Sequence, residues 1–155
     1  RRARPERAGE ETDSPVVSGS TRPRPIVLGG RSMGGRMCSM IAAGADGLDP
    51  PPGLAGLVLI GYPLHPPKRP DRLRTEHFGG ITVPTLFVSG TRDEFGSPDE
   101  LTAATGAIPG PVEHVWIDGG RHELRGADAE IAGAVATFVD RITRVPGVTE
   151  PRRRG

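Results

Sequence analysis

The chain has 155 residues, which corresponds to one domain, and its 17 proline and 23 glycine residues imply many loops. Its formal net charge of +1 gives no reason to expect nucleic acid or an anionic membrane as a partner. A single cysteine, Cys38, excludes an intramolecular disulfide and a metal site of several cysteines. No apolar run approaches the roughly 20 residues of a membrane span, and no signal peptide is visible, so we expect a cytoplasmic protein.

Residues 1–24 consist mainly of Arg, Glu, Pro, Ser and Gly, with Val16 and Val17 as the adjacent apolar pair. Such a segment cannot bury enough surface to offset the entropy of ordering it. We therefore expect a disordered leader over 1–24, one folded domain over 25–145 and a flexible tail over 146–155.

The motif Gly-x-Ser-x-Gly, centred on Ser32, follows a short apolar run over 25–28 that predicts a strand. The motif is typical of a sharp turn from strand to helix, in which the serine takes a positive φ and Gly30 and Gly34 prevent a collision. After it, apolar residues recur at the spacing of one helix face: Met33, Met37, Met40 and Ile41. The alternative is a serine in an ordinary loop, and the strand and helix around the motif favour the sharp turn.

The remaining elements are predicted from apolar runs, turn residues and caps. Ser97 and Glu100 form a capping box with Pro98 between them, which predicts the start of a helix. In chain order the sequence predicts a helix end near Gly44, a loop over 45–53, a strand over 54–61, a long loop over 63–74, a strand over 83–89, a turn over 90–96, a helix over 98–106, a strand over 112–117 and a helix over 128–143.

The alternation of strands and helices predicts a three-layer α/β/α fold with a parallel sheet of about four strands and right-handed crossovers. Three loops at the same edge of this sheet then carry Ser32, Asp93 and His122, in that chain order. Serine, acid and histidine follow in this order in the α/β-hydrolase fold. Glu94 and Asp118 are the rival candidates for the acid.

From Pro25 to about Arg144 the chain resembles the carboxyl-terminal half of a dienelactone-hydrolase-like α/β-hydrolase. The matching motifs are Gly-Arg-Ser-Met-Gly-Gly-Arg, Gly-Tyr-Pro-Leu-His-Pro-Pro, Gly-Thr-Arg-Asp-Glu-Phe-Gly and Gly-Gly-Arg-His. The resemblance implies a partial α/β-hydrolase fold in which Ser32 is the nucleophile, His122 its base and Asp93 the residue that orients the histidine. The amide of Met33 would then face a developing oxyanion.

Other side chains carry weaker signals. His65, in the loop after the second strand, is expected either to line a substrate pocket or to be a surface histidine. Arg31 is expected to contact an acidic substrate, to face solvent or to pair with an acid. His77 and His114 have no convergent partners and are predicted to be structural. We interpret Cys38 as a small buried hydrophobic residue rather than a reactive thiol.

The leader contains nothing that resembles the strands that normally precede the serine turn in this family, or the loop that supplies a second oxyanion amide. We therefore expect a truncated product whose strand over 26–29 lies at an exposed sheet edge, with possible self-association through that edge. One hypothesis is a serine hydrolase of small-molecule acyl substrates that needs no metal or organic cofactor. The other is a catalytically weak or inactive half-domain that acts, if at all, as an interaction module.

Overall fold

A computed structural model describes residues 24–144 of the chain. Its sheet contains four parallel strands in the order β1 (Ile26–Arg31), β2 (Leu54–Ile60), β3 (Thr85–Gly90) and β4 (Val112–Ile117). The helices are α1 (Met33–Ala42), α2 (Pro98–Thr105) and α3 (Asp128–Thr143), with short 3-10 helices η1 (Ala45–Gly47) and η2 (Phe78–Gly80). The predicted tail, and the predicted leader apart from Arg24, lie outside the described residues.

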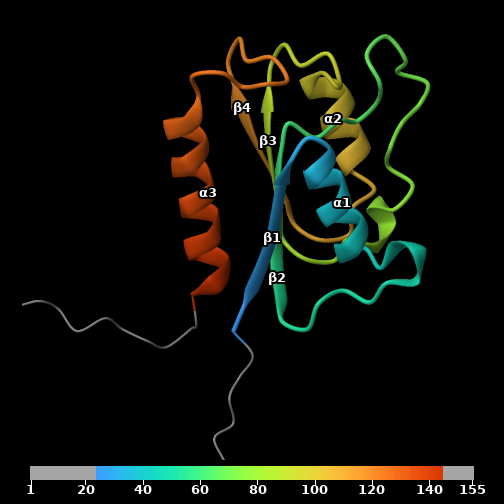
Figure 1. The fold of residues 1–155 in the computed structure, drawn as a ribbon, viewed down its shortest axis with the longest axis vertical. Helices are drawn as coiled ribbons and strands as arrows, with labels where there is room; N and C mark the ends of the chain where they lie inside the picture. Colours follow the sequence, from blue (N-terminus) through green and yellow to red (C-terminus); the bar gives the residue numbers. More distant parts are fainter. Residues whose placement is uncertain (1–23, 145–155) are drawn as a thin grey trace, which may run out of the picture.

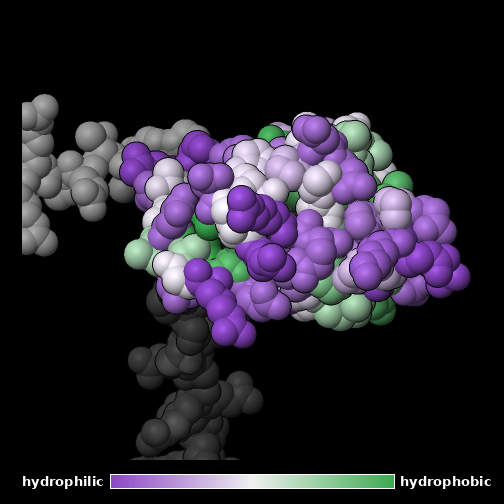
Figure 2. Space-filling model, turned by 90° about the horizontal axis from the view of Figure 1, so that it is seen from above, coloured by the Kyte–Doolittle hydropathy of each residue, from purple (hydrophilic) through white to green (hydrophobic). Residues whose placement is uncertain are grey.

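The helices cover both faces of the sheet (Figure 1). α1 and α2 lie on one face and α3 lies alone on the other. This arrangement confirms the predicted three-layer α/β/α fold. No helix in the described range is both long enough and apolar enough to span a bilayer. Seen from above, the end of the molecule where the loops gather is largely hydrophilic (Figure 2).

The core lies in two layers because successive side chains of a strand point to opposite faces of the sheet. Leu57 and Leu59 of β2 pack toward α1 and α2, whereas Val58 between them packs toward α3. All six residues of β3 are buried, as the continuous apolar run of a central parallel strand predicts. The larger cluster contains the aromatic side chains Tyr62, Phe78 and Phe87.

The predicted capping box of α2 is present. The Ser97 hydroxyl accepts a hydrogen bond from the Glu100 amide, and the Ser97 amide donates to the Glu100 carboxylate at 2.9 Å. This capping lowers the pKa of the Glu100 carboxyl, first through the backbone hydrogen bond. The sequence therefore located the start of α2 correctly.

The buried face of α1 consists of its small residues. Gly35, Ser39 and Ala42 are buried, whereas Met33 and Met37, on the predicted apolar face, are 48% and 41% exposed. Apolar spacing therefore located the helix but not the side that packs on the sheet.

β1 is one of the two outer strands of the sheet in the described residues, and β4 is the other. β1 pairs with β2 along one side, and within residues 24–144 no strand pairs with its other side. Its side chains are accordingly exposed or half-buried along its whole length, in contrast to those of β3. For the described part of the chain, the predicted edge position is confirmed.

Two of the histidines are internal parts of the fold, in agreement with their predicted structural role. The Nε2 atom of His77 lies 2.7 Å from the Ser39 hydroxyl, and that of His114 lies 3.0 Å from the Thr105 hydroxyl. The ring of His114 also stacks against Trp116. Burial lowers the pKa of both histidines below their ordinary value of 6.5.

We expect the folded state to lose stability as the pH falls from about 7.5 to about 5.5. A histidine whose pKa is lowered by folding binds its proton more readily in the unfolded chain, so acidification through 6.5 favours unfolding. Urea denaturation at several pH values measures this effect, and His114→Gln should flatten the pH dependence. A free energy of unfolding that rises on acidification over this range would contradict the expectation.

Candidate active site

Ser32 occupies the turn between β1 and α1. Its backbone has φ 50° and ψ −122°, the positive φ that the motif predicts and that L-residues rarely adopt. The Ser32 amide donates to the Ile60 carbonyl at 2.8 Å, which fixes the turn to the neighbouring strand. Serine often caps a helix from this position, but the Ser32 hydroxyl does not cap α1. It contacts His122 instead.

The steric demand for glycine falls on Gly30 and Gly35, not on Gly30 and Gly34 as predicted. A Cβ atom on Gly30 would lie 2.5 Å from the carbonyl carbon of Gly34 and 2.6 Å from the nitrogen of Gly35. A Cβ atom on Gly35 would lie 2.8 Å from the carbonyl oxygen of Gly30, whereas one on Gly34 would meet no atom within 4 Å. The first turn of α1 thus rests against the end of β1 through two glycine backbones.

Asp93 and His122 come from loops that follow the neighbouring strands β3 and β4. The two loops are tied together by a hydrogen bond from the Arg92 amide to the Gly120 carbonyl at 2.8 Å. Gly90 allows this approach, since a Cβ atom there would overlap the Gly120 carbonyl. Asp93 is 6% exposed, and the Phe95 amide donates to its Oδ1 atom at 2.9 Å.

The three side chains form a continuous line of contacts. The Oγ atom of Ser32 lies 2.7 Å from Nε2 of His122, and Nδ1 of the same ring lies 3.0 Å from Oδ2 of Asp93. An ionised carboxylate can only accept, so Nδ1 carries the proton in the neutral ring and Nε2 is left to accept from the serine hydroxyl. This arrangement can move a proton from Ser32 to His122.

The two rival acids lie elsewhere. Asp118 is exposed and accepts from the Thr91 hydroxyl at 3.4 Å, and Glu94 is exposed to solvent. Of the three acids considered from the sequence, Asp93 is the one in contact with His122. Its catalytic role remains a prediction.

Phe95 is a neighbour of this group that the sequence did not reveal. Its ring centroid lies 4.1 Å from that of His122, at an interplanar angle of 34°. Its carbonyl accepts from the His65 amide at 3.0 Å. An aromatic residue two positions after the acid was visible in the sequence, but no spacing rule indicates that its ring covers the histidine.

His65 is buried and held by two contacts. Its Nδ1 atom lies 2.9 Å from the Pro66 carbonyl, and its Nε2 atom lies 3.5 Å from a Glu100 carboxylate oxygen. It is therefore not the surface histidine that we weighed as the alternative. Its part in substrate binding remains a prediction, and the contacts seen here support the loop around Phe95.

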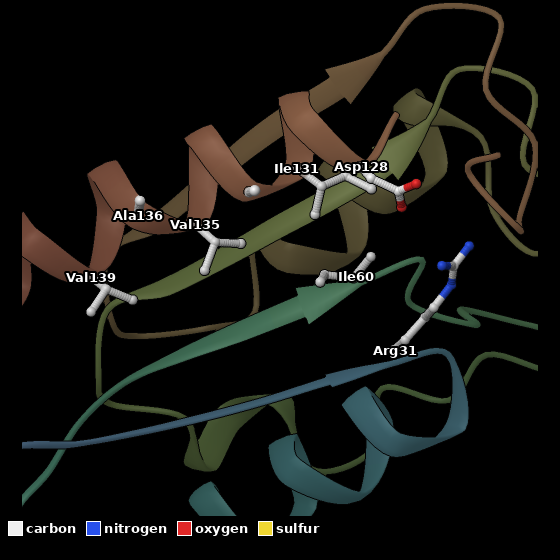
Figure 3. A pocket seen from close by; sticks show the side chains of 8 residues that line it. Arg31, Ile60, Asp128, Ile131, Val135, Ala136 and Val139 are labelled. Carbon is white, nitrogen blue, oxygen red and sulfur yellow. The ribbon is translucent and has the colours of Figure 1, made fainter. Parts of the chain in front are cut away.

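Arg31 lies beside a groove on the opposite face of β1 from α1. The groove has a volume of about 570 Å³ between α3 and the ends of β1 and β2, and the guanidinium of Arg31 extends toward Asp128 at its mouth (Figure 3). Ser32, Asp93 and His122 are not among the groove's lining residues. The two predicted substrate contacts therefore lie in different places: Arg31 lines the groove beside α3, and His65 is buried against Pro66 and Glu100.

The amide of Met33 stands at the start of α1, a helix of ten residues. The first amides of a helix have no partner inside it, and the helix dipole adds positive potential there. Because Met33 follows Ser32 directly, its amide is suited to an oxyanion formed at the serine. That role remains a prediction.

Comparison with known proteins agrees with this architecture. A sequence model of the alpha/beta hydrolase domain matches residues 1–142. The esterase domain of a Rhodothermus marinus protein matches with a TM-score of 0.59 and 18% identity over 76% of this chain and 60% of its own. Est1E from Butyrivibrio proteoclasticus gives 0.61 and 16% identity over 76% and 61%. Thermogutta terrifontis esterase 2 gives 0.59 and 20% identity over 84% and 59%.

These structural likenesses establish the fold. The chain spans about three fifths of the length of each of the three esterases, with coverages of 60%, 61% and 59%. The comparison therefore concerns the sheet and helices described above rather than a complete esterase.

We expect Gly30→Ala to destabilise the fold and Gly34→Ala not to destabilise it. The added methyl at position 30 meets backbone atoms that cannot move aside, and should cost on the order of 1–3 kcal/mol. At position 34 it enters open space within α1, and should be neutral or stabilise by up to about 1 kcal/mol. Urea denaturation of the two variants measures both effects, and a larger loss for Gly34→Ala would contradict the packing described here.

Proposed function

Because the chain belongs to the alpha/beta hydrolase family, we propose that it is a serine hydrolase of ester, thioester or similar acyl bonds in small molecules. One observation carries the proposal: Ser32, held at a positive φ, has its Oγ atom 2.7 Å from a histidine whose other nitrogen contacts a buried aspartate. The finer dienelactone-hydrolase-like assignment rests on the motif resemblance alone.

In the proposed reaction the Ser32 Oγ atom attacks the acyl carbon while Nε2 of His122 takes the hydroxyl proton. The imidazolium that forms is stabilised by Asp93, which also keeps Nδ1 protonated and the ring in place. Collapse of the tetrahedral intermediate breaks the bond to the alcohol or thiol, which leaves with the proton from Nε2. Water then attacks the acyl-enzyme with the same base and releases the acid.

The oxyanion would be held by the Met33 amide at the start of α1. A second donor normally comes from another loop, and loss of one such donor costs about 10²- to 10³-fold in turnover. The half-buried ring of Phe95 offers an apolar surface beside His122 for the substrate.

We also propose Arg31 and His65 as substrate contacts, on weaker grounds than the three residues above. The exposed side chain of Arg31 lines the groove beside α3, so it must turn toward Ser32 before it can bind an acidic group of the substrate. His65 can act through the loop that carries Phe95, which its backbone amide holds. Among side chains, the proposed reaction itself uses only those of Ser32, Asp93 and His122.

The nucleophile can be tested with a fluorophosphonate probe, which we expect to label Ser32. Ser32→Ala should abolish labelling. Ser39→Ala is the matched control, because the Ser39 hydroxyl also lies 2.7 Å from a histidine Nε2 but is fully buried. Mass spectrometry of the labelled peptide identifies the site, and equal labelling of Ser32→Ala would remove Ser32 from the mechanism.

The acid can be tested by the rate of the same labelling reaction, which does not require turnover. Asp93→Asn should slow it strongly, toward the roughly 10⁴-fold loss that follows when an orienting carboxylate is neutralised. Asp118→Asn, the control, should leave the rate unchanged because Asp118 contacts Thr91 instead. A slow Asp118→Asn variant beside a normal Asp93→Asn variant would show the assignment of the acid to be wrong.

A further inference from the structure

Phe95 contacts both of the residues that support Ser32 in the proposed reaction. Its backbone amide donates to Oδ1 of Asp93 at 2.9 Å, and its ring lies against that of His122 with 4.1 Å between the centroids. At this distance and an interplanar angle of 34°, the two rings overlap by their faces. One residue thus holds the acid through its backbone and the base through its side chain.

The hydrogen bond to Asp93 does not by itself fix the orientation of the His122 ring. It holds the ring at Nδ1, where the two carboxylate oxygens lie 3.1 and 3.0 Å away, but it leaves the tilt of the ring free. A second ring stacked against one face restricts that tilt, because aromatic rings pack in a small set of orientations. Since Nε2 belongs to the same rigid ring, its distance of 2.7 Å from Oγ of Ser32 depends on the tilt.

The backbone of Gly61, at the end of β2, also lies close to this imidazole. A Cβ atom on Gly61 would lie 3.1 Å from the His122 carbonyl oxygen and 3.7 Å from Cε1 of its ring. Gly61 has a φ of 55°, and its amide donates to the Val88 carbonyl at 2.8 Å, so this segment is fixed to the sheet. The imidazole is therefore confined by a fixed backbone segment and by the side chain of Phe95.

The loop after β2 also holds Phe95 itself. The Phe95 carbonyl accepts from the His65 amide at 3.0 Å, and a Cβ atom on the next residue, Gly96, would lie 2.9 Å from Cβ of Leu64. The buried ring of His65 in turn has Nε2 at 3.5 Å from a carboxylate oxygen of Glu100 in α2. The backbone that carries the Phe95 ring is therefore fixed by a second segment of the chain.

We propose that Phe95 is a positioning residue for His122: its ring keeps the imidazole at the tilt in which Nε2 meets the Ser32 hydroxyl. This inference rests on the proposed function and deepens it, because it names a second residue, besides Asp93, that orients the base. The stack also acts after the proton has moved. A cation above an aromatic face is attracted to it, so the Phe95 ring stabilises the imidazolium formed on His122.

The test measures the labelling of Ser32 by a fluorophosphonate in the full 155-residue chain. In this reaction the Ser32 oxygen bonds to phosphorus, the hydroxyl proton passes to Nε2 of His122 and fluoride leaves, so the rate depends on where the imidazole stands. Rates at increasing probe concentration separate the binding of the probe from the covalent step. Phe95→Leu removes the aromatic face but keeps an apolar side chain, and Phe95→Tyr keeps the face.

Trp116→Leu is the matched control. Trp116 also stacks on a histidine, with 5.0 Å between its ring centroid and that of His114 and an interplanar angle of 4°. Nε2 of His114 contacts the Thr105 hydroxyl rather than Ser32, so loss of this stack should leave the labelling rate unchanged. Circular dichroism reports whether each variant is folded.

We expect Phe95→Leu to slow the covalent step about 10- to 100-fold, since a misplacement of about 1 Å can cost 10²-fold in rate. Binding of the probe should change far less, and Phe95→Tyr should restore most of the rate. In the unmodified chain, NMR should show contacts between the ring protons of Phe95 and those of His122. This last measurement tests the stack even if Phe95→Leu does not fold.

Several results would overturn this inference and leave the proposed function standing. They are a normal covalent step in Phe95→Leu, a loss confined to probe binding, a Phe95→Tyr or Trp116→Leu variant as slow as Phe95→Leu, and the absence of the NMR contacts. A loss confined to binding would make Phe95 a substrate contact instead. An unmodified chain whose Ser32 is not labelled at all would overturn the proposed function, and the inference with it.

Discussion

The contact between the backbones of Gly30 and Gly35 determines where Ser32 stands in the candidate site. It lets α1 begin immediately against the end of β1, with Ser32 as the single residue that reverses the chain at a positive φ. Such a conformation costs on the order of 1–3 kcal/mol and persists only where the surroundings enforce it. Here the amide of Ser32 is held by Ile60 on β2, so the strain is balanced by the sheet. The position of the Ser32 hydroxyl is consequently set by the backbone conformation of the turn.

The other two side chains depend on a second backbone contact, between the loops after β3 and β4. Gly90 lets the loop after β3 touch the carbonyl of Gly120, and Asp93 then contacts the ring of His122. β3 is buried along its whole length and β4 pairs with it at six positions, so this part of the sheet is a firm base. β1 and β4 are the two outer strands of the described sheet, and each pairs with one neighbour at six positions. Ser32 and His122 therefore follow the two outer strands, whereas Asp93 follows the fully buried β3.

The sequence predicted most elements of the fold because its apolar runs and turn residues agree with each other. The helix over 128–143 and the capping box at Ser97 were located to within a residue or two, since local spacing and local hydrogen bonds determine them. The buried face of α1 was not, because a close glycine contact, rather than apolar content, decides which side meets the sheet. The sequence motif also predicted that Gly34 must lack a side chain to avoid a collision. In the structure this requirement falls on Gly35, because its Cβ atom would meet the Gly30 carbonyl. The position of the Phe95 ring depends on the path of its loop, and the groove beside Arg31 depends on the space between α3 and the strands. Residue spacing in the sequence predicts neither feature.

The chain contains two serine–histidine pairs at the same separation, and their comparison shows what the candidate site requires. Ser39 and His77 are 2.7 Å apart, as are Ser32 and His122. Ser39, however, is fully buried and donates to the Arg36 carbonyl, and Nδ1 of His77 has no partner among the described residues. Burial lowers the pKa of His77, so this ring is poorly suited to hold the proton that a serine would give up. At Ser32 the histidine has a carboxylate on its other nitrogen and the serine lies at the start of a helix. Both pairs therefore share the same distance between the serine oxygen and the histidine nitrogen. The contact with Asp93 and the turn at Ser32 distinguish the pair that we propose as nucleophile and base.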